Sequence, residues 1–225
     1  MPTGSSAASP GPAEPRLPEV LPRLSPAILE DEAEWSGIEV VGEVQGPEEI
    51  SHLEVASSHL RQVRLPGRQF DQLRFVDVLL EDCDLSFATL SRASFVRVEF
   101  RRCRMSGLIG AGLRAKDVRF TDVKLDGANL RMTECERSSF ERCDLSEVDF
   151  YSARLPAARL VECNLTGAQL AKSEVKGAAL HGSALEGVRG AESVRGVVIG
   201  SDQILPLSLS VFTALGITVD DDHLD

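Results

Sequence analysis

Large apolar residues recur at every fifth position through most of this chain. Between Leu60 and Leu185, 22 of the 26 residues at this spacing are leucine, phenylalanine or methionine. The residue two positions before each of them is uncharged everywhere except at Arg68, and it is mostly Ala, Val, Cys or Ser. Each five-residue unit therefore supplies one large and one smaller residue to a core.

A five-residue period fits neither an amphipathic helix nor a straight strand. On a helix, with about 100° per residue, leucines five apart would scatter around the whole circumference. On a strand, positions five apart point to opposite faces, so half of the leucines would face water. Both conflicts disappear if the chain turns a corner once in every five residues. Four corners then close a square coil of twenty residues, which predicts an all-β solenoid.

Residues twenty positions apart show the pattern of stacked neighbours that this coil requires. In such a solenoid they lie about 4.8 Å apart, the spacing of adjacent strands. One column consists of Cys83, Cys103, Cys143 and Cys163, and two outward columns alternate in charge: Asp77, Arg97, Asp117, Arg137 and Asp82, Arg102, Asp122, Arg142, Glu162. Stacked opposite charges stabilise a sheet by roughly a few tenths of a kcal/mol per pair.

The weakest part of the repeat also fits a packed core. Where the large residue shrinks to Gly110 and Ala115, the residue two positions earlier grows to Leu108 and Leu113. Core volume is thereby conserved locally, as a close-packed interior requires.

Several segments of the repeat resemble a known protein family. The segments CDLSF, GANLR, CDLSE and CNLTG match the A(D/N)LXX consensus of the pentapeptide-repeat proteins. The resemblance covers roughly two thirds of the chain, and its repetition makes it specific. It implies the family's right-handed quadrilateral parallel β-helix, with about seven coils of twenty residues over residues 58–200.

The N-terminal part of the chain departs from the repeat. Residues 1–24 are rich in Pro, Ser, Ala and Gly and do not read as a signal peptide, so we expect a disordered tail on a cytoplasmic protein. In residues 25–57 we expect a short acidic helix, from Ser25-Pro26 to a stop at Gly37, and then an irregular first coil. Trp35 and Ile28 on this helix either cover the open end of the first coil or belong to a loosely packed linker.

The C-terminal part begins with a slip in register after Leu185. Gly190 and Arg195 occupy the expected positions of the repeat, whereas Val194 and Ile199 fit a register one residue earlier. In residues 201–225 we expect a helix over 206–215, which caps the last coil, and an acidic tail.

This C-terminal helix is apolar nearly all round, which exceeds what a cap needs. Members of the resembled family often associate through this end. One interpretation is therefore a homodimer, with a twofold interface that contains Leu205, Leu209, Phe212 and Leu215. The alternative is that the helix is wholly buried against the last coil of its own chain.

The sequence offers no catalytic, cofactor or metal site. The cysteine column points into an apolar interior and a straight row of thiols cannot make a tetrahedron, so we interpret these residues as small buried hydrophobes. His59 and His181 are about six coils apart, and the tail Asp220-Asp221-Asp222-His223 is expected to be solvated rather than to chelate a cation. No apolar run approaches the length of a membrane span. We expect a non-enzymatic protein without a cofactor.

The negative charge of the chain belongs to its ends. Residues 58–200 carry a net charge of +3, residues 1–57 carry −9 and residues 201–225 carry −5. A candidate patch for an acidic protein partner consists of Arg97, Arg101, Arg102 and Arg104. The alternative is a ladder in which Glu81, Asp82, Glu99 and Asp122 neutralise these arginines. Direct nucleic-acid binding is not expected, because the acidic ends oppose the basic field that it needs.

Two hypotheses about function follow. The first is a non-enzymatic scaffold that binds a protein partner, of unknown identity, through the walls or ends of the solenoid. The second comes from the resemblance: some relatives look like B-form DNA and bind type II topoisomerases such as DNA gyrase, giving quinolone tolerance. Such mimicry needs an acidic solenoid, and a net charge of +3 with alternating columns weakens this alternative.

Overall fold

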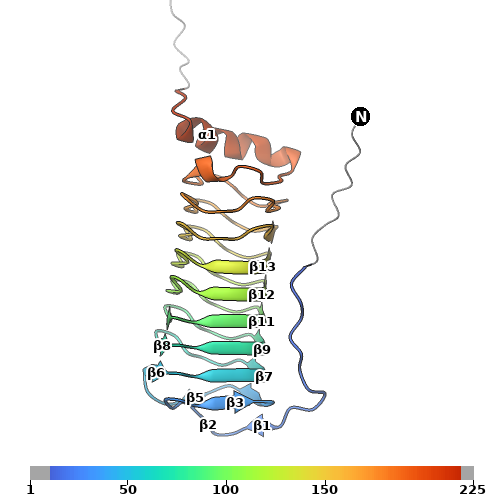
Figure 1. Cartoon of the computed structure of the whole chain (residues 1–225), viewed down its shortest axis with the longest axis vertical. Coiled ribbons are helices and arrows are strands. Elements are labelled where there is room, and N and C mark those ends of the chain that lie inside the picture. Colours follow the sequence, from blue (N-terminus) through green and yellow to red (C-terminus); the bar gives the residue numbers. More distant parts are fainter. Residues whose placement is uncertain (1–10, 219–225) are drawn as a thin grey trace, which may run out of the picture.

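The computed structural model describes residues 11–218, which form a four-sided parallel β-solenoid of about seven turns (Figure 1). This confirms the all-β solenoid predicted from the repeat. One α-helix, α1 (Ile204–Ala214), lies across the C-terminal end, preceded by two 3₁₀ helices, η1 (Ala191–Ser193) and η2 (Ser201–Gln203). No helix in this part of the chain combines the length and apolar character that a membrane crossing requires.

The eight-residue strands each turn a corner at their middle, as at Asp77, and so run along two sides of a coil; the other strands are shorter. The strands are β1 (Arg23–Leu24), β2 (Ala27–Ile28), β3 (Glu34–Ser36), β4 (Glu39–Val41), β5 (Val44–Gln45), β6 (Glu49–Ser51), β7 (Glu54–Arg61), β8 (Gln69–Asp71), β9 (Arg74–Glu81), β10 (Thr89–Ser91), β11 (Ser94–Arg101), β12 (Arg114–Thr121), β13 (Glu134–Glu141) and β14 (Arg159–Val161).

Strands of successive coils pair in parallel with a register of twenty residues, except that β1 and β4 are offset by sixteen and β2 and β5 by seventeen. The largest sheet has the order β1-β4-β7-β9-β11-β12-β13-β14, with β3 also paired to β7. In the smaller sheets, β8 pairs with β6 on one side and β10 on the other, and β2 pairs with β5. Phe75 lies opposite Phe95, which lies opposite Ala115. The twenty-residue columns are therefore confirmed.

Each corner is made by a residue with a left-handed backbone. The φ angle is 57° at Asp77, 55° at Asp82 and 52° at Arg97, and glycine takes the same role at Gly107 and Gly127. A left-handed backbone costs a residue with a side chain roughly 1–2 kcal/mol. These corners change the side-chain direction once in five residues, which is why positions five apart all point inward.

The core packs as the compensated repeat predicts. Leu108 and Leu113 are buried where Gly110 and Ala115 leave room. A Cβ atom on Gly110 would lie 3.2 Å from a methyl carbon of Leu108, so the site has no space for a second large residue. Stacked aromatic pairs line part of the core: Phe75–Phe95, Phe100–Phe120 and Phe120–Phe140, with ring centroids 5.2, 4.9 and 4.7 Å apart.

The cysteines are core residues. All five are free and buried, which confirms their interpretation as small buried side chains. The Cys83 and Cys163 thiols donate to the carbonyl oxygens of Leu60 and Phe140, at 3.3 and 3.4 Å. Burial raises the pKa of the Cys135 thiol to about 12, so it remains protonated at neutral pH.

The helix expected from Ser25-Pro26 to Gly37 is wrong. This segment forms β2 and β3, which pair with β5 and β7. Ala27 and Leu29 are buried while Ile28 between them is exposed, so burial alternates as on a strand. Pairing with the next coil overrides the local helix propensity. Trp35 lies in β3 and is buried in the core, whereas Ile28 is exposed. These two residues therefore do not cover the open end of the first coil together.

Arg68, the one charged residue at an inward position, closes the first coil. Its guanidinium donates to the carbonyl oxygens of Gly46 at 3.0 Å and Val44 at 3.3 Å, and also to that of Pro47. Carbonyl groups that leave regular pairing need such a donor. Arg68, the exception in the apolar pattern, therefore caps the carbonyl groups of the first coil.

The slip in register near the C-terminus is confirmed. Gly177 N–H donates to Gly196 O at 3.0 Å, and Ala179 pairs with Val198, so these partners are nineteen rather than twenty residues apart. The expected helix over 206–215 is present as α1. Its Leu207 is buried and Val211 packs against the core.

Gln203, which immediately precedes α1, satisfies the carbonyl groups of the last coil. Its buried Nε2 donates to Leu180 O and Ser183 O, both at 2.6 Å, and its Oε1 accepts from Gly200 N–H at 2.8 Å. Leu180 O also accepts from Ser183 N–H at 3.1 Å, but Ser183 O would otherwise be buried without a partner, which is costly. The Gln203 side chain thus makes hydrogen bonds to the last coil that a further coil would otherwise make.

Residues 11–22, which we call the strap, run along the outside of the solenoid from β1 past β12 (Figure 1). Arg16 and Ala13 of the strap are hydrogen-bonded to the wall. The disorder expected for residues 1–24 is therefore wrong for residues 11–24. Residues 1–10 and 219–225, which include the acidic tail with Asp220 and His223, lie outside the described residues.

Candidate functional site

The four arginines of the predicted patch come from one coil, and three of them form ion pairs. Arg104 lies on the adjoining wall, between Asp84 and Lys124 in the ladder of bridges. The ion pairs are Arg97 with Asp77 at 2.6 Å, Arg101 with Glu99 at 2.7 Å, and Arg102 with Glu81 at 2.6 Å and Asp82 at 2.8 Å. The geometry is that of the self-neutralising ladder, the alternative that the sequence left open.

The two charged corner columns are built from repeated Asp–Arg pairs. In one column, Asp77 accepts two bonds from Arg97 and Asp117 accepts two from Arg137, all between 2.6 and 2.7 Å. In the other, Asp82 pairs with Arg102 and Asp122 with Arg142 at 2.8 to 3.1 Å. The bidentate fork holds each carboxylate in one orientation.

The column with Asp77 and Asp117 has a second set of contacts, with the strap. Arg16 N–H donates to Asp77 Oδ1 at 3.0 Å, and Ala13 N–H donates to Asp117 Oδ1 at 3.1 Å. Arg119 Nη2 donates to the carbonyl oxygen of Pro12 at 3.2 Å. The carboxylates are thus shared between the arginine fork and the strap backbone.

The pKa values of these two carboxyl groups follow from their partners. The hydrogen bond from Arg97 is the main cause that lowers the pKa of Asp77 below 3.8, and that from Arg137 does the same for Asp117. The strap N–H groups lower both pKa values further. Both groups are therefore ionised at neutral pH and accept hydrogen bonds as anions.

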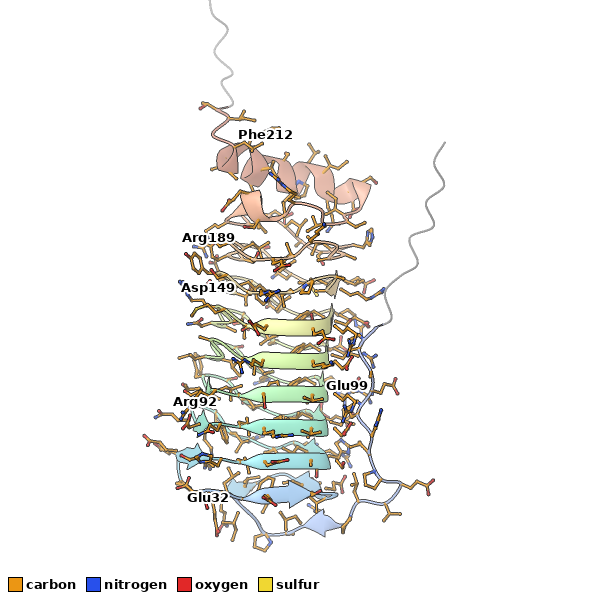
Figure 2. The ribbon with its side chains drawn as sticks, viewed as in Figure 1. Glu32, Arg92, Glu99, Asp149, Arg189 and Phe212 are labelled. Carbon is orange, nitrogen blue, oxygen red and sulfur yellow. The ribbon has the colours of Figure 1, made fainter. Side chains whose placement is uncertain are left out.

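Three residues of the predicted dimer interface are on α1, at the C-terminal end, and the fourth, Leu215, directly follows it. Leu205 is 80%, Leu209 66%, Phe212 38% and Leu215 65% exposed. The first three follow a helical i, i+4, i+7 spacing, which places them on one stripe. Figure 2 shows Phe212 at this end of the solenoid. The helix is therefore not wholly absorbed by the last coil of its own chain.

A shallow depression of about 400 Å³ lies on the wall beside the strap-bearing one. It forms where Phe95 is followed in its column by the small Ala115 and Cys135. Its rim alternates in charge, with Lys116 Nζ 3.3 Å from Glu136 Oε2. It therefore presents no single charge to a ligand.

A cation–aromatic cluster lies on the wall opposite the strap. Tyr151, the only tyrosine of the chain, has the Arg131 guanidinium carbon 4.3 Å and the Lys172 ammonium 5.2 Å from its ring centroid. Arg131 also pairs with Asp149 at 3.0 Å. Such contacts at exposed positions stabilise by roughly 0.5–1 kcal/mol.

Sequence reasoning missed the strap site, although two signals for it were present. Aspartate recurs at every second position of the corner column, at Asp77 and Asp117, and proline recurs at every third position of the strap, at Pro12, Pro15 and Pro18. Within residues 11–218, no group of three or more His, Cys, Asp or Glu side chains is arranged to hold a metal ion.

Comparison with solved structures finds several proteins of low sequence identity to this chain. Full-length QnrB1, described as a plasmid-mediated fluoroquinolone resistance protein, is 19% identical over 85% of this chain and 98% of its own, with a TM-score of 0.41. HetL, a pentapeptide repeat protein involved in heterocyst differentiation regulation in the cyanobacterium Nostoc sp. strain PCC 7120, is 16% identical over 75% of this chain and 85% of its own, with a TM-score of 0.34. A pentapeptide repeat protein from the Arabidopsis thaliana thylakoid lumen is 25% identical over 56% of this chain and 72% of its own, with a TM-score of 0.33.

Sequence comparison gives the family directly. A model described as pentapeptide repeat region matches residues 53–130, and one described as pentapeptide repeats (8 copies) matches residues 119–156 and 149–187. No individual curated protein matches the chain in sequence. The two models together follow the solenoid from β7 to beyond β14, and the chain therefore belongs to the pentapeptide-repeat family.

Proposed function

We propose that this protein is a non-enzymatic scaffold that assembles as a homodimer through α1 and binds a protein partner through the walls of its solenoid. The observation that carries the proposal is the exposed apolar stripe of α1, defined by Leu205, Leu209, Phe212 and Leu215. Large apolar side chains exposed side by side mark interaction surfaces more often than scattered ones do.

A twofold interface makes economical use of this stripe. In such an interface each copy contributes the same residues, so the four side chains of each chain place eight apolar side chains in the interface. The Leu207 and Val211 side of the helix is already in contact with the core, which fixes the orientation of the opposite side. A rigid, pre-positioned stripe loses little conformational entropy when it associates.

Cysteine cross-linking tests the homodimer. The native thiols are buried, so a cysteine introduced by Leu209→Cys is expected to be the reactive one. A short bis-maleimide should join two copies of this variant covalently. Phe87→Cys is the matched control, because Phe87 is equally exposed, at 68%, but lies on a side wall. Equal cross-linking of the two variants, or of neither, contradicts an interface through α1.

The DNA-mimic alternative finds no support in the arrangement of charges. The acidic corners alternate with arginines that pair with them, as Asp82 does with Arg102 and Asp122 with Arg142. A DNA-gyrase supercoiling assay separates the two functions. The scaffold proposal predicts no inhibition and no protection from a quinolone at stoichiometric protein. Inhibition or protection would favour the mimic.

A further inference from the structure

The wall under the strap differs from an ordinary solenoid wall because its outward side chains are buried. Asp77, Glu99 and Asp117 point away from the core, yet they are only 7%, 5% and 5% exposed. Figure 2 shows Glu99 on the side of the solenoid that faces the strap. Pro12 of the strap is itself buried. The strap and this wall therefore form a real interface.

The spacing of the strap matches the spacing of the wall. Asp77 and Asp117 are two coils apart, which is about 9.6 Å along the axis. Arg16 and Ala13, which donate to them, are three residues apart, and three residues of polyproline II advance about 9.3 Å. Prolines at every third residue favour the polyproline II conformation, and they all lie on the same edge of that helix. One turn of the strap thus corresponds to two coils of the solenoid.

Each N–H group that contacts the wall follows a proline. Ala13 follows Pro12 and Arg16 follows Pro15, so the repeated unit is a proline and then a donor. The wall also donates to the strap: Arg119 Nη2 donates to the Pro12 carbonyl oxygen, and Arg119 Nη1 lies 3.6 Å from Glu14 Oε1. The wall therefore contacts mainly the backbone of an extended segment, together with the Glu14 side chain.

The acceptors are confined to two positions. The same corner column continues with Gly37 and Ser57 below Asp77, and with Ala157 and Gly177 above Arg137. Only Asp77 and Asp117 present carboxylates in it. Their arginine forks keep both carboxylates oriented before any segment binds, so little reorganisation is needed.

We propose that this wall is a binding surface for an extended peptide with a proline at every third residue, and that residues 11–18 occupy it in cis. A partner segment with the same spacing then binds only where the strap has left. The proposal rests on the scaffold function and deepens it, because it names the wall and the chemical type of partner.

The test uses the full chain with the variant Ala13→Pro/Arg16→Pro. This change removes both donors of the strap but retains its polyproline II preference, so it should release the strap. A fluorescent peptide with the native sequence of residues 11–22 is then titrated, to millimolar concentration, against the variant and the wild type. We expect saturable binding to the variant and at least about tenfold weaker binding to the wild type, whose strap competes.

Two controls identify the contacts. A peptide that carries Ala13→Pro and Arg16→Pro should not bind. In the strap-released chain, Asp77→Ala/Asp117→Ala should weaken peptide binding at least about tenfold, since it removes both acceptors. The matched change Asp82→Ala/Asp122→Ala removes an equivalent pair of corner carboxylates on the neighbouring column and should leave binding unchanged.

A second released variant keeps the test decisive. In it residues 11–18 are replaced by a glycine–serine stretch of the same length. Failure of the peptide to bind both released variants, with their circular dichroism unchanged, overturns the proposal, and so does equal sensitivity to the two pairs of alanine changes. Cross-linking through Leu209→Cys reports the homodimer independently, so the scaffold proposal is judged separately.

Discussion

At the scale of single residues, the corner aspartates serve two purposes. Asp77 and Asp117 adopt a left-handed backbone, with φ of 57° at each, which costs free energy. The bidentate pairs with Arg97 and Arg137 help to offset that cost, and the same carboxylates accept the strap N–H groups. The alternating charge was readable in the sequence. The strap contact was not, because it joins residues 61 and 104 positions apart.

These carboxylates predict how strap docking depends on pH. The hydrogen bond from Arg97 lowers the folded-state pKa of Asp77 below 3.8, so its contribution is fully present above that pH and is lost as pH falls through the lower folded value. Asp117, paired with Arg137, behaves alike. Amide hydrogen exchange at Ala13 and Arg16, corrected for intrinsic rates, should show constant protection from pH 5 to 7. Loss of protection within that range contradicts the assignment.

The thiols give a second prediction at this scale. All five cysteines are buried and burial raises the pKa of Cys135 to about 12, so native thiols should resist a disulfide reagent at neutral pH. Full reaction should follow denaturation in guanidinium. Rapid modification of any thiol in the native protein, measured by absorbance of the released chromophore, would count against a closed core.

At the scale of elements, the repeat determined nearly everything between β7 and β14, and local signals at the N-terminus misled. Ser25-Pro26 resembles the start of a helix, but these residues form the bend between β1 and β2, which pair with β4 and β5. Local helix propensity is a weak signal where the unpaired backbone groups at the open end of a β-solenoid need a pairing strand. At the C-terminal end the local signals agreed with the structure. The slip in register after Leu185 corresponds to a shortened coil, and the apolar run before Gly216 corresponds to α1.

The closure by Gln203 can be tested as an element-scale prediction. Gln203→Leu retains a similar volume but removes the donors to Leu180 O and Ser183 O. Leaving the buried Ser183 carbonyl oxygen without a partner should lower the free energy of unfolding by about 1–3 kcal/mol. Urea denaturation followed by circular dichroism measures it. Ser208→Ala, at a half-buried position of α1, leaves no buried carbonyl without a partner; it is the control and should have an effect below about 0.5 kcal/mol. Equal midpoints for the two variants would show that Gln203 is not a cap.

At the scale of the whole molecule, the solenoid presents unlike surfaces. One wall is covered by the strap, the opposite wall carries Tyr151 between two cations, and the C-terminal end exposes the apolar stripe of α1. The sequence predicted this end, because apolar residues there exceeded what a cap can bury. It did not predict the covered wall, since three-residue proline spacing has no partner in a five-residue repeat until both are placed in space.

The molar mass in solution tests the homodimer most directly. Size-exclusion chromatography with light scattering at micromolar concentration should give twice the chain mass of 24.3 kDa for the wild type. Leu209→Glu/Leu215→Glu places charges on the stripe and should give the mass of a single chain, while Phe87→Glu on a side wall should leave the dimer intact. A wild-type mass of 24.3 kDa would contradict association through α1.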